Sequence, residues 1–134
     1  GDPETEVVLP LLESDAYDVF YGIATGANSQ SPIANSPLQW RNEATIGVVL
    51  ASKGYPGSYA RGAVIEGTEL FDGPIFHMGT KNDNGVLKTN GGRVMMCIAT
   101  GKDITTAREK VYKEIEKIHC DNLFYRKDIA HWAL

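Results

Sequence analysis

Residues 93–118, RVMMCIATGKDITTAREKVYKEIEKI, decide the fold of this chain. Residues 93–100 are β-rich and largely apolar, which predicts a strand. From Asp103 onward, apolar residues recur at helical spacing on one stripe, while Arg, Glu and Lys occupy the other positions. The members of the stripe are Ile104, Ala107, Val111, Ile115 and Ile118. The pattern predicts one long helix packed on a small sheet.

Other β-rich segments precede this run in the sequence. Clusters of Gly, Pro, Asn and Asp separate them, and the cluster at residues 82–85 is typical of a hairpin turn between two short strands. The predicted strands cover residues 44–52, 63–65, 74–81 and 86–88. The chain therefore combines a small sheet with helices, and its fold class is α+β.

Two shorter helices are predicted before the first strand. Asp2 can cap a helix whose first position is Pro3, since the amide hydrogen that proline lacks would be unpaired there. Pro10 lies too deep for a first turn, so we expect a kink or a break near it. Ser14 can cap a second helix, which Gly26 ends. The apolar stripes of these helices are Val7, Val8, Leu11 and Leu12, and then Ala16, Val19, Phe20, Ile23 and Ala24.

Composition limits the organisation and the partners of the chain. Residues 27–37 are rich in Asn, Ser, Gln and Pro, typical of a solvated connection, so we predict a boundary between residues 1–37 and residues 38–134. The net charge of −4 argues against a nucleic-acid or anionic-membrane partner. No apolar run approaches the ~20 residues that cross a bilayer, and the N-terminus is acidic where a signal peptide would be basic. We expect a cytoplasmic protein in which Cys97 and Cys120 are free thiols.

Two loops and the acidic start of the chain carry candidate binding groups. The carboxylates of Asp2 and Glu4 can orient an ammonium group or help to hold a metal, although Asp2 is equally suited to a simple capping role. Lys53 and Tyr55 lie in KGYPG, residues 53–57, where glycine lets the backbone pass close to a ligand. The spacing of that motif is also that of a structural turn.

The segment Gly91-Gly92-Arg93 is the third candidate. Glycine amides together with a fork-shaped guanidinium group can form a seat for phosphate or carboxylate, but the segment matches no phosphate-loop consensus. His77 favours a packing role, and no His or Cys in the sequence has the spacing of a zinc site or of a nucleophile with its base. The residues therefore indicate binding groups and no catalytic or metal-ligating group.

Five motifs follow one another over nearly the whole chain. They are Gly1-Asp2-Pro3-Glu4-Thr5, Lys53-Gly54-Tyr55-Pro56-Gly57, His77-Met78-Gly79-Thr80, Gly91-Gly92-Arg93-Val94 and Phe124-Tyr125-Arg126-Lys127-Asp128-Ile129. Together they make the chain resemble the C-terminal third of phosphoribosylamine-glycine ligase, an ATP-grasp enzyme of purine synthesis. The resemblance implies a fragment in which two N-terminal helices from an ATP-grasp core precede a small β-barrel-like domain (a barrel-sandwich hybrid) with one long helix.

The resemblance also implies a reaction. The ligase uses ATP and Mg (or Mn) to convert glycine to glycyl phosphate, from which 5-phosphoribosylamine displaces phosphate to give glycinamide ribonucleotide. The metal-binding Glu and Asn of the family precede the position of Gly1, so the fragment should hold no catalytic, cofactor or metal residue and should be inactive alone. Its partners would be the two substrates and the N-terminal and ATP-grasp domains of the same protein. The implied substrate-binding residues are Asp2, Glu4, Lys53, Tyr55, Gly91, Gly92 and Arg93.

The last motif, residues 124–129, is expected to return as an extended segment after the long helix. Phe124 and Ile129 should lie in the core, and residues 126–128 at the surface. Two positions depart from the family, which usually has Ala at Met78 and commonly has Gly at Ala130. Two other classes of function stay open: a biotin or lipoyl carrier, for which Lys81 lies near a hairpin, and a non-catalytic interaction domain.

Overall fold

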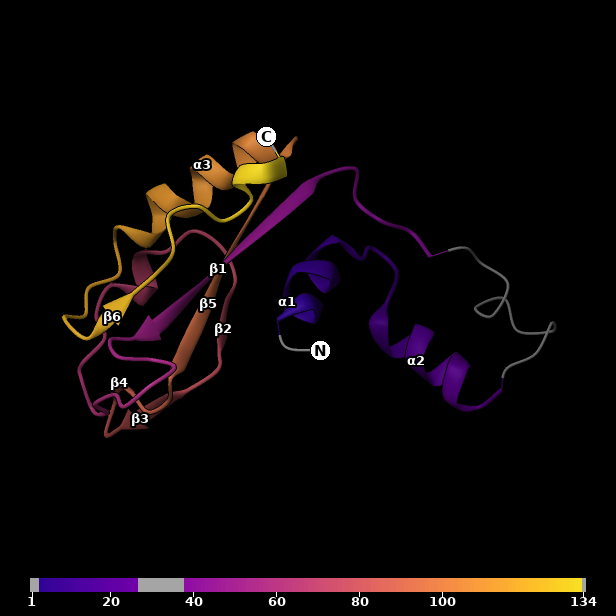
Figure 1. Ribbon diagram of the computed structural model, residues 1–134. Coiled ribbons are helices and arrows are strands. Elements are labelled where there is room, and N and C mark those ends of the chain that lie inside the picture. The colour runs from indigo at the N-terminus through magenta and orange to yellow at the C-terminus, as the bar shows by residue number, and fades with distance from the viewer. Residues whose placement is uncertain (1–2, 27–37, 134) are drawn as a thin grey trace.

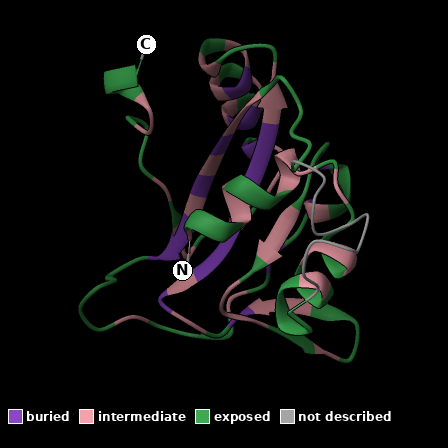
Figure 2. Cartoon of the chain, turned by 90° about the vertical axis from the view of Figure 1, so that its right-hand side faces the viewer, coloured by how far each residue is buried: buried purple, intermediate pink, exposed green. Residues whose placement is uncertain are grey.

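The computed structural model of the chain describes residues 3–26 and 38–133. Its centre is a four-stranded antiparallel sheet in the order β2-β5-β1-β6 (Figure 1). The two central strands, β1 (Ala44–Ser52) and β5 (Arg93–Gly101), are long, whereas β2 (Ile75–His77) and β6 (Leu123–Phe124) are short edge strands. Buried residues concentrate on the two central strands (Figure 2). Both central strands were predicted from the sequence.

The residues of β1 alternate between the two faces of the sheet, as the pleat requires. Even-numbered residues lie under the helix α3 (Ile104–Ile115), and odd-numbered residues lie on the other face. The first set is Ile46, Val48 and Leu50, and the second is Gly47, Val49 and Ala51. A register shift after Leu50 places Ala51 opposite Arg93 at the start of β5.

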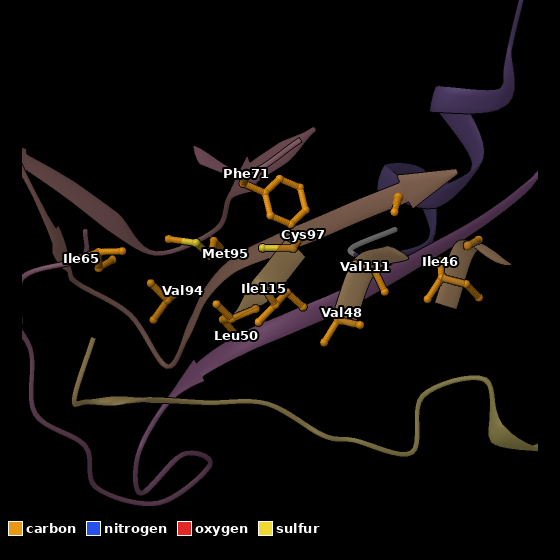
Figure 3. Packing of buried hydrophobic residues seen from close by; sticks show 12 residues of the cluster. Ile46, Val48, Leu50, Ile65, Phe71, Val94, Met95, Cys97, Val111 and Ile115 are labelled. Carbon is orange, nitrogen blue, oxygen red and sulfur yellow. The ribbon is translucent and has the colours of Figure 1, made fainter. Parts of the chain in front are cut away.

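The hydrophobic core lies between the sheet and α3 (Figure 3). The helix begins after Asp103, as the sequence predicts, and the side chain of Asp103 caps it by accepting a hydrogen bond from the Thr106 amide at 2.8 Å. It ends at Ile115, so Ile118 lies beyond the helix but still packs against the core. Fully buried members of this core include Val48, Leu50, Val94, Met95, Cys97, Val111 and Ile115.

A separate hairpin contains β3 (Thr80–Asp83) and β4 (Val86–Thr89). Its turn is formed by Asn84 and Gly85, with φ values of 53° and 87°, which is the backbone expected for an Asn-Gly hairpin turn. The predicted hairpin is confirmed. Because the described strands form two separate sheets, they do not produce the barrel-like closure that the resemblance implied.

Two of the predicted strands differ in the structure. The prediction for residues 74–81 is wrong as one strand, because the chain bends at Gly79 between β2 and β3. A Cβ at Gly79 would lie 2.5 Å from the Arg93 carbonyl oxygen, so the close approach of two backbones requires glycine there. The prediction for residues 63–65 is also wrong, because Val64 makes only an isolated bridge to Lys88.

The N-terminal segment forms α1 (Glu4–Val8), a 3-10 turn over Leu9–Leu11, and α2 (Ala16–Ala24). The break near Pro10 is confirmed, but α1 begins after Pro3, not at it. Ser14 does not cap α2. Its hydroxyl oxygen instead accepts from the Gln39 amide at 2.9 Å, and the side chain of Asp15 caps the helix.

The two N-terminal helices are packed differently. α1 lies against the face of the sheet opposite α3 (Figure 1), and a Cβ at Gly47 would lie 2.7 Å from Cγ1 of Val7. By contrast, α2 projects away from the sheet, and its large apolar side chains are exposed. These side chains are Tyr17, Phe20, Tyr21 and Ile23. The predicted boundary after residue 37 and its linker, residues 27–37, lie outside the described residues and stay predictions.

Candidate functional site

A pocket of about 450 Å³ opens on the face of the sheet opposite α3. Its floor consists of residues with small or apolar side chains from the two central strands: Gly47, Val49, Ala51 and Met96. Its walls come from Pro3, from the loop after β1, from the start of β5 and from residues 124–129. Segments that are far apart in the sequence therefore converge on one cavity.

The loop after β1 and the loop before β5 are held together by Ser52. Its amide donates to the Gly92 carbonyl and its hydroxyl donates to the Gly91 carbonyl, both at 2.8 Å. The Tyr55 ring lies directly against Gly92, because a Cβ at that position would be 2.2 Å from Cδ2 of the ring. Only glycine at position 92 leaves room for this ring, which stands beside Arg93 at the edge of the pocket.

The conformation of residues 53–57 also depends on glycine. Gly54 has a φ of 97°, and a Cβ there would lie 2.2 Å from the Ser58 carbonyl oxygen. The Lys53 amide donates to the Asn122 carbonyl at 2.8 Å, which ties the loop to the segment before β6. The backbone thus orients Tyr55 toward the pocket, whereas the exposed Lys53 is not among the lining residues.

The opposite wall, residues 124–129, is fixed to α3 through its backbone. Nε and Nη2 of Arg108 donate to the carbonyls of Ile129 and Lys127 at 2.9 and 2.8 Å. The Tyr112 hydroxyl donates to the Arg126 carbonyl at 2.7 Å and accepts from the Ile129 amide at 3.2 Å. These hydrogen bonds hold the wall in place against α3, although the wall has little regular secondary structure.

The described residues of the pocket lining include two cations. Two guanidinium groups, those of Arg93 and Arg126, belong to the lining, and among the described lining residues there is no carboxylate. Arg126 makes a fork to Asp128, from Nε to Oδ1 at 2.9 Å and from Nη2 to Oδ2 at 2.7 Å. This hydrogen-bonded pair lowers the pKa of Asp128 and raises that of Arg126. The arrangement favours an anionic ligand with a partly apolar surface.

Two other kinds of chemistry in the described residues would be those of a thiol nucleophile and of a metal site. Burial raises the pKa of the Cys97 thiol to about 12, so it is not a nucleophile at neutral pH. Over residues 3–26 and 38–133, no group of three or more His, Cys, Asp or Glu residues is placed to hold a metal ion. In the same residues, no helix has both the length and the apolar character that spanning a membrane requires.

Residues 45–132 match the protein family described as "Phosphoribosylglycinamide synthetase, C domain". The chain belongs to this family. A phosphoribosylamine-glycine ligase from Halalkalibacterium halodurans is 44% identical over 136 residues, which cover 100% of this chain and 30% of the relative. A protein of the same name from Synechocystis sp. is 42% identical over 137 residues, with coverages of 100% and 32%.

A solved structure supports the same assignment. The crystal structure of phosphoribosylamine-glycine ligase from Thermotoga maritima is similar with a TM-score of 0.76 and 37% sequence identity. The similarity covers 97% of this chain and 31% of that chain. The chain thus spans about a third of the length of the relatives that it matches, and its mixed α/β domain is that of the synthetase C-domain family.

The structure brings together some of the residues that the sequence singled out. Tyr55 and Arg93 line one pocket, and Gly92 is the residue on which the Tyr55 ring rests. Gly91 has a packing role, since a Cβ there would lie 3.0 Å from Cα of Gly79. Glu4 is exposed in the first turn of α1 and, like Lys53, is not a lining residue. Asp2 lies outside the described residues.

Sequence reasoning missed the contribution of residues 124–129 to the pocket. Phe124 was expected in the core but is 39% exposed, because it sits opposite Ala51 on an edge strand and lines the face that α3 does not cover. Arg126 and Asp128 are at the surface as expected, yet Arg126 also lines the pocket. Arg126 and Asp128 are two residues apart in a segment that was predicted to be extended, and this spacing could have indicated that their side chains lie on one side.

Three further sequence predictions can be compared with the structure. Cys97 and Cys120 are free thiols, as expected. Lys81, the residue on which a carrier function would depend, lies within β3 opposite Lys88 and not in the Asn84-Gly85 turn. A carrier lysine has to be presented on the hairpin turn, so this placement does not favour the carrier hypothesis. His77 bonds through Nδ1 to the Thr80 hydroxyl at 2.9 Å, but its side chain is exposed, so it is a hydrogen-bonded surface residue and not the packing residue that the sequence predicted.

Proposed function

We propose that this chain forms one wall of the substrate site in an ATP-dependent ligase that joins glycine to 5-phosphoribosylamine. The product would be glycinamide ribonucleotide, formed with ADP and phosphate through glycyl phosphate. The supporting observation is the cavity that Tyr55, Arg93 and Arg126 line together with an apolar floor. The names of the relatives supply the substrate class, and the two guanidinium groups in the pocket lining supply a physical reason for binding the phosphorylated substrate.

ATP and the divalent ion, Mg or Mn, would be bound by other parts of the parent protein. This is the arrangement expected if the metal-binding Glu and Asn precede Gly1, and the described residues offer no metal-ligating cluster to replace them. The chain would contribute orientation and electrostatic stabilisation, with no covalent step on its own side chains. Alone it would have no ligase activity, and the parent enzyme would be cytoplasmic.

The N-terminal helices would complete the contact with the ATP-grasp core. Tyr17 and Ile23 of α2 are 71% and 73% exposed, so the helix carries an apolar surface that this chain does not cover. We propose that residues 1–37 comprise the C-terminal helices of the ATP-grasp core and the linker to the C-terminal domain of residues 38–134. Since α1 also packs on the sheet, movement of the core would be transmitted to the pocket floor.

The test is steady-state ligase activity of the parent enzyme with Arg93→Ala, with glycine and 5-phosphoribosylamine varied separately. We expect kcat/KM for 5-phosphoribosylamine to fall by ~100-fold, because a charged phosphate contact is lost. Arg41→Ala is the matched control, because Arg41 is exposed and does not line the pocket. Unchanged kinetics in a folded Arg93→Ala enzyme would refute the role of Arg93, and absence of ligase activity in the wild type would refute the function.

A further inference from the structure

Arg126 is an exposed residue whose backbone and side chain are both held by hydrogen bonds. The Tyr112 hydroxyl holds its backbone carbonyl, and the Asp128 carboxylate holds its guanidinium group by two hydrogen bonds. An exposed arginine normally retains much of its rotamer freedom, and ordering such a side chain opposes folding. The two hydrogen bonds to Asp128 give the guanidinium group a defined orientation at the pocket, which would reduce the ordering cost of binding a ligand there.

The fork to Asp128 determines which edge of Arg126 can meet a ligand. It uses the Nε–H group and one Nη2–H group, two of the five N–H donors of the side chain. The two N–H groups of Nη1 are not used by this pairing and can donate to an anion. The pairing with Asp128 also sets the orientation of the guanidinium plane. Because Arg126 and Arg93 line the same cavity, an anion there can be contacted by two guanidinium groups.

We propose that Arg126 is a second binding residue for the phosphate group of 5-phosphoribosylamine, acting together with Arg93, and that Asp128 is its positioning residue. This inference rests on the proposed function. The tyrosine and phenylalanine rings of the walls, Tyr55, Phe124 and Tyr125, would then face the ribose ring, while the two guanidinium groups bind the phosphate. Glycine carries no phosphate and would not depend on Arg126.

The test compares Arg126→Gln with the matched control Lys127→Met in the parent enzyme. Lys127 is the adjacent exposed cation and does not line this pocket. For Arg126→Gln we expect KM for 5-phosphoribosylamine to rise roughly 10- to 100-fold, with kcat and KM for glycine within about twofold of wild type. Inhibition by ribose 5-phosphate, used as a non-reacting probe, should weaken by a similar factor. Lys127→Met should change none of these constants.

Asp128→Ala separates binding from a purely structural role. This variant removes the fork but keeps the Arg126 guanidinium, so a phosphate can still attract it, and the rise in KM for 5-phosphoribosylamine should be smaller than in Arg126→Gln. Equal defects in both variants that also extend to glycine would overturn the proposal, since the pair would then only hold the segment. If Arg126→Gln fails to fold, Arg126→Lys carries the test: it keeps the charge, loses the fork, and should show an intermediate KM.

Two outcomes distinguish this proposal from the proposed function. If Arg93→Ala raises KM for 5-phosphoribosylamine while Arg126→Gln leaves it unchanged, the ligase function stands and the role of Arg126 is refuted. If the wild-type parent enzyme shows no ligase activity, both proposals are refuted together.

Discussion

The contact between Gly92 and the Tyr55 ring provides the sharpest test of how the pocket is built. In Gly92→Ala, the new Cβ would lie 2.2 Å from Cδ2 and 2.6 Å from Cε2 of that ring. Carbon atoms in contact lie about 3.5 Å apart, so the ring has to move by about 1.3 Å. Tyr55 is 38% exposed, and the ring can relieve the clash by turning toward solvent. The substitution should therefore displace a pocket wall without unfolding the domain.

The expected effect on function is much larger than the effect on stability. A displacement of about 1 Å in a positioning group can reduce catalysis by roughly 100-fold, so kcat/KM for 5-phosphoribosylamine in the parent enzyme should fall 10- to 100-fold. The free energy of unfolding should fall by less than about 1 kcal/mol, because a partly exposed ring has room to move. Steady-state kinetics and urea unfolding of the same variant measure the two quantities.

A double-mutant cycle with Tyr55→Ala identifies the cause. Once the ring is absent, Gly92→Ala has nothing to displace, and the second substitution should add little to the defect of Tyr55→Ala. The reasoning is refuted if Gly92→Ala lowers kcat/KM by the same factor with and without the ring. It is also refuted if the folded single variant keeps wild-type kinetics.

Three further predictions concern stability and reactivity. Ala130 has a φ of 58°, a left-handed conformation that disfavours a Cβ, so Ala130→Gly should raise the free energy of unfolding by up to about 1 kcal/mol in urea titrations. In native protein a thiol reagent should label the partly buried Cys120 and not Cys97, and labelling of both at equal rates would contradict the burial of Cys97. The Lys117 ammonium lowers the pKa of Glu114 below its ordinary 4.5, so unfolding should become easier as pH falls through that region. Glu114→Gln should flatten this part of the pH profile, and an unchanged profile would show that other carboxyl groups cause it.

The sequence predicted those elements whose signals are local. The long helix has a capping Asp103 and a regular apolar stripe, and the hairpin has Asn-Gly at its turn, so neighbouring residues alone define both. The sequence failed where the determinant is a distant contact. Gly79 interrupts a β-rich run because Gly91 and the Arg93 carbonyl lie close to it. No residue near Gly79 in the sequence indicates this close approach.

For the candidate site too, the sequence predicted what depends on local signals and missed what depends on distant contacts. The motifs identified Tyr55 and Arg93 one by one, and glycine content marked both loops as unusual, but nothing in the spacing showed that the loops touch. Arg126 was predicted at the surface, which is correct and incomplete, because a residue can be exposed to solvent and line a pocket at once. Phe124 was misplaced because hydrophobic character alone does not tell which face of the sheet a side chain occupies.

The pairing of β1 with β5 explains why the two loops meet. In an antiparallel pair the end of one strand lies beside the beginning of the other, so the loop that follows β1 and the loop that precedes β5 emerge at the same edge of the sheet. The register shift after Leu50 then sets Ala51 opposite Arg93, and Ser52 closes the junction by bonding to both Gly91 and Gly92. Ser52 is fully buried, so these two hydrogen bonds are shielded from water and an alanine there would leave the Gly91 carbonyl without its partner. The relative position of Tyr55 and Arg93 therefore depends on a serine that does not line the pocket.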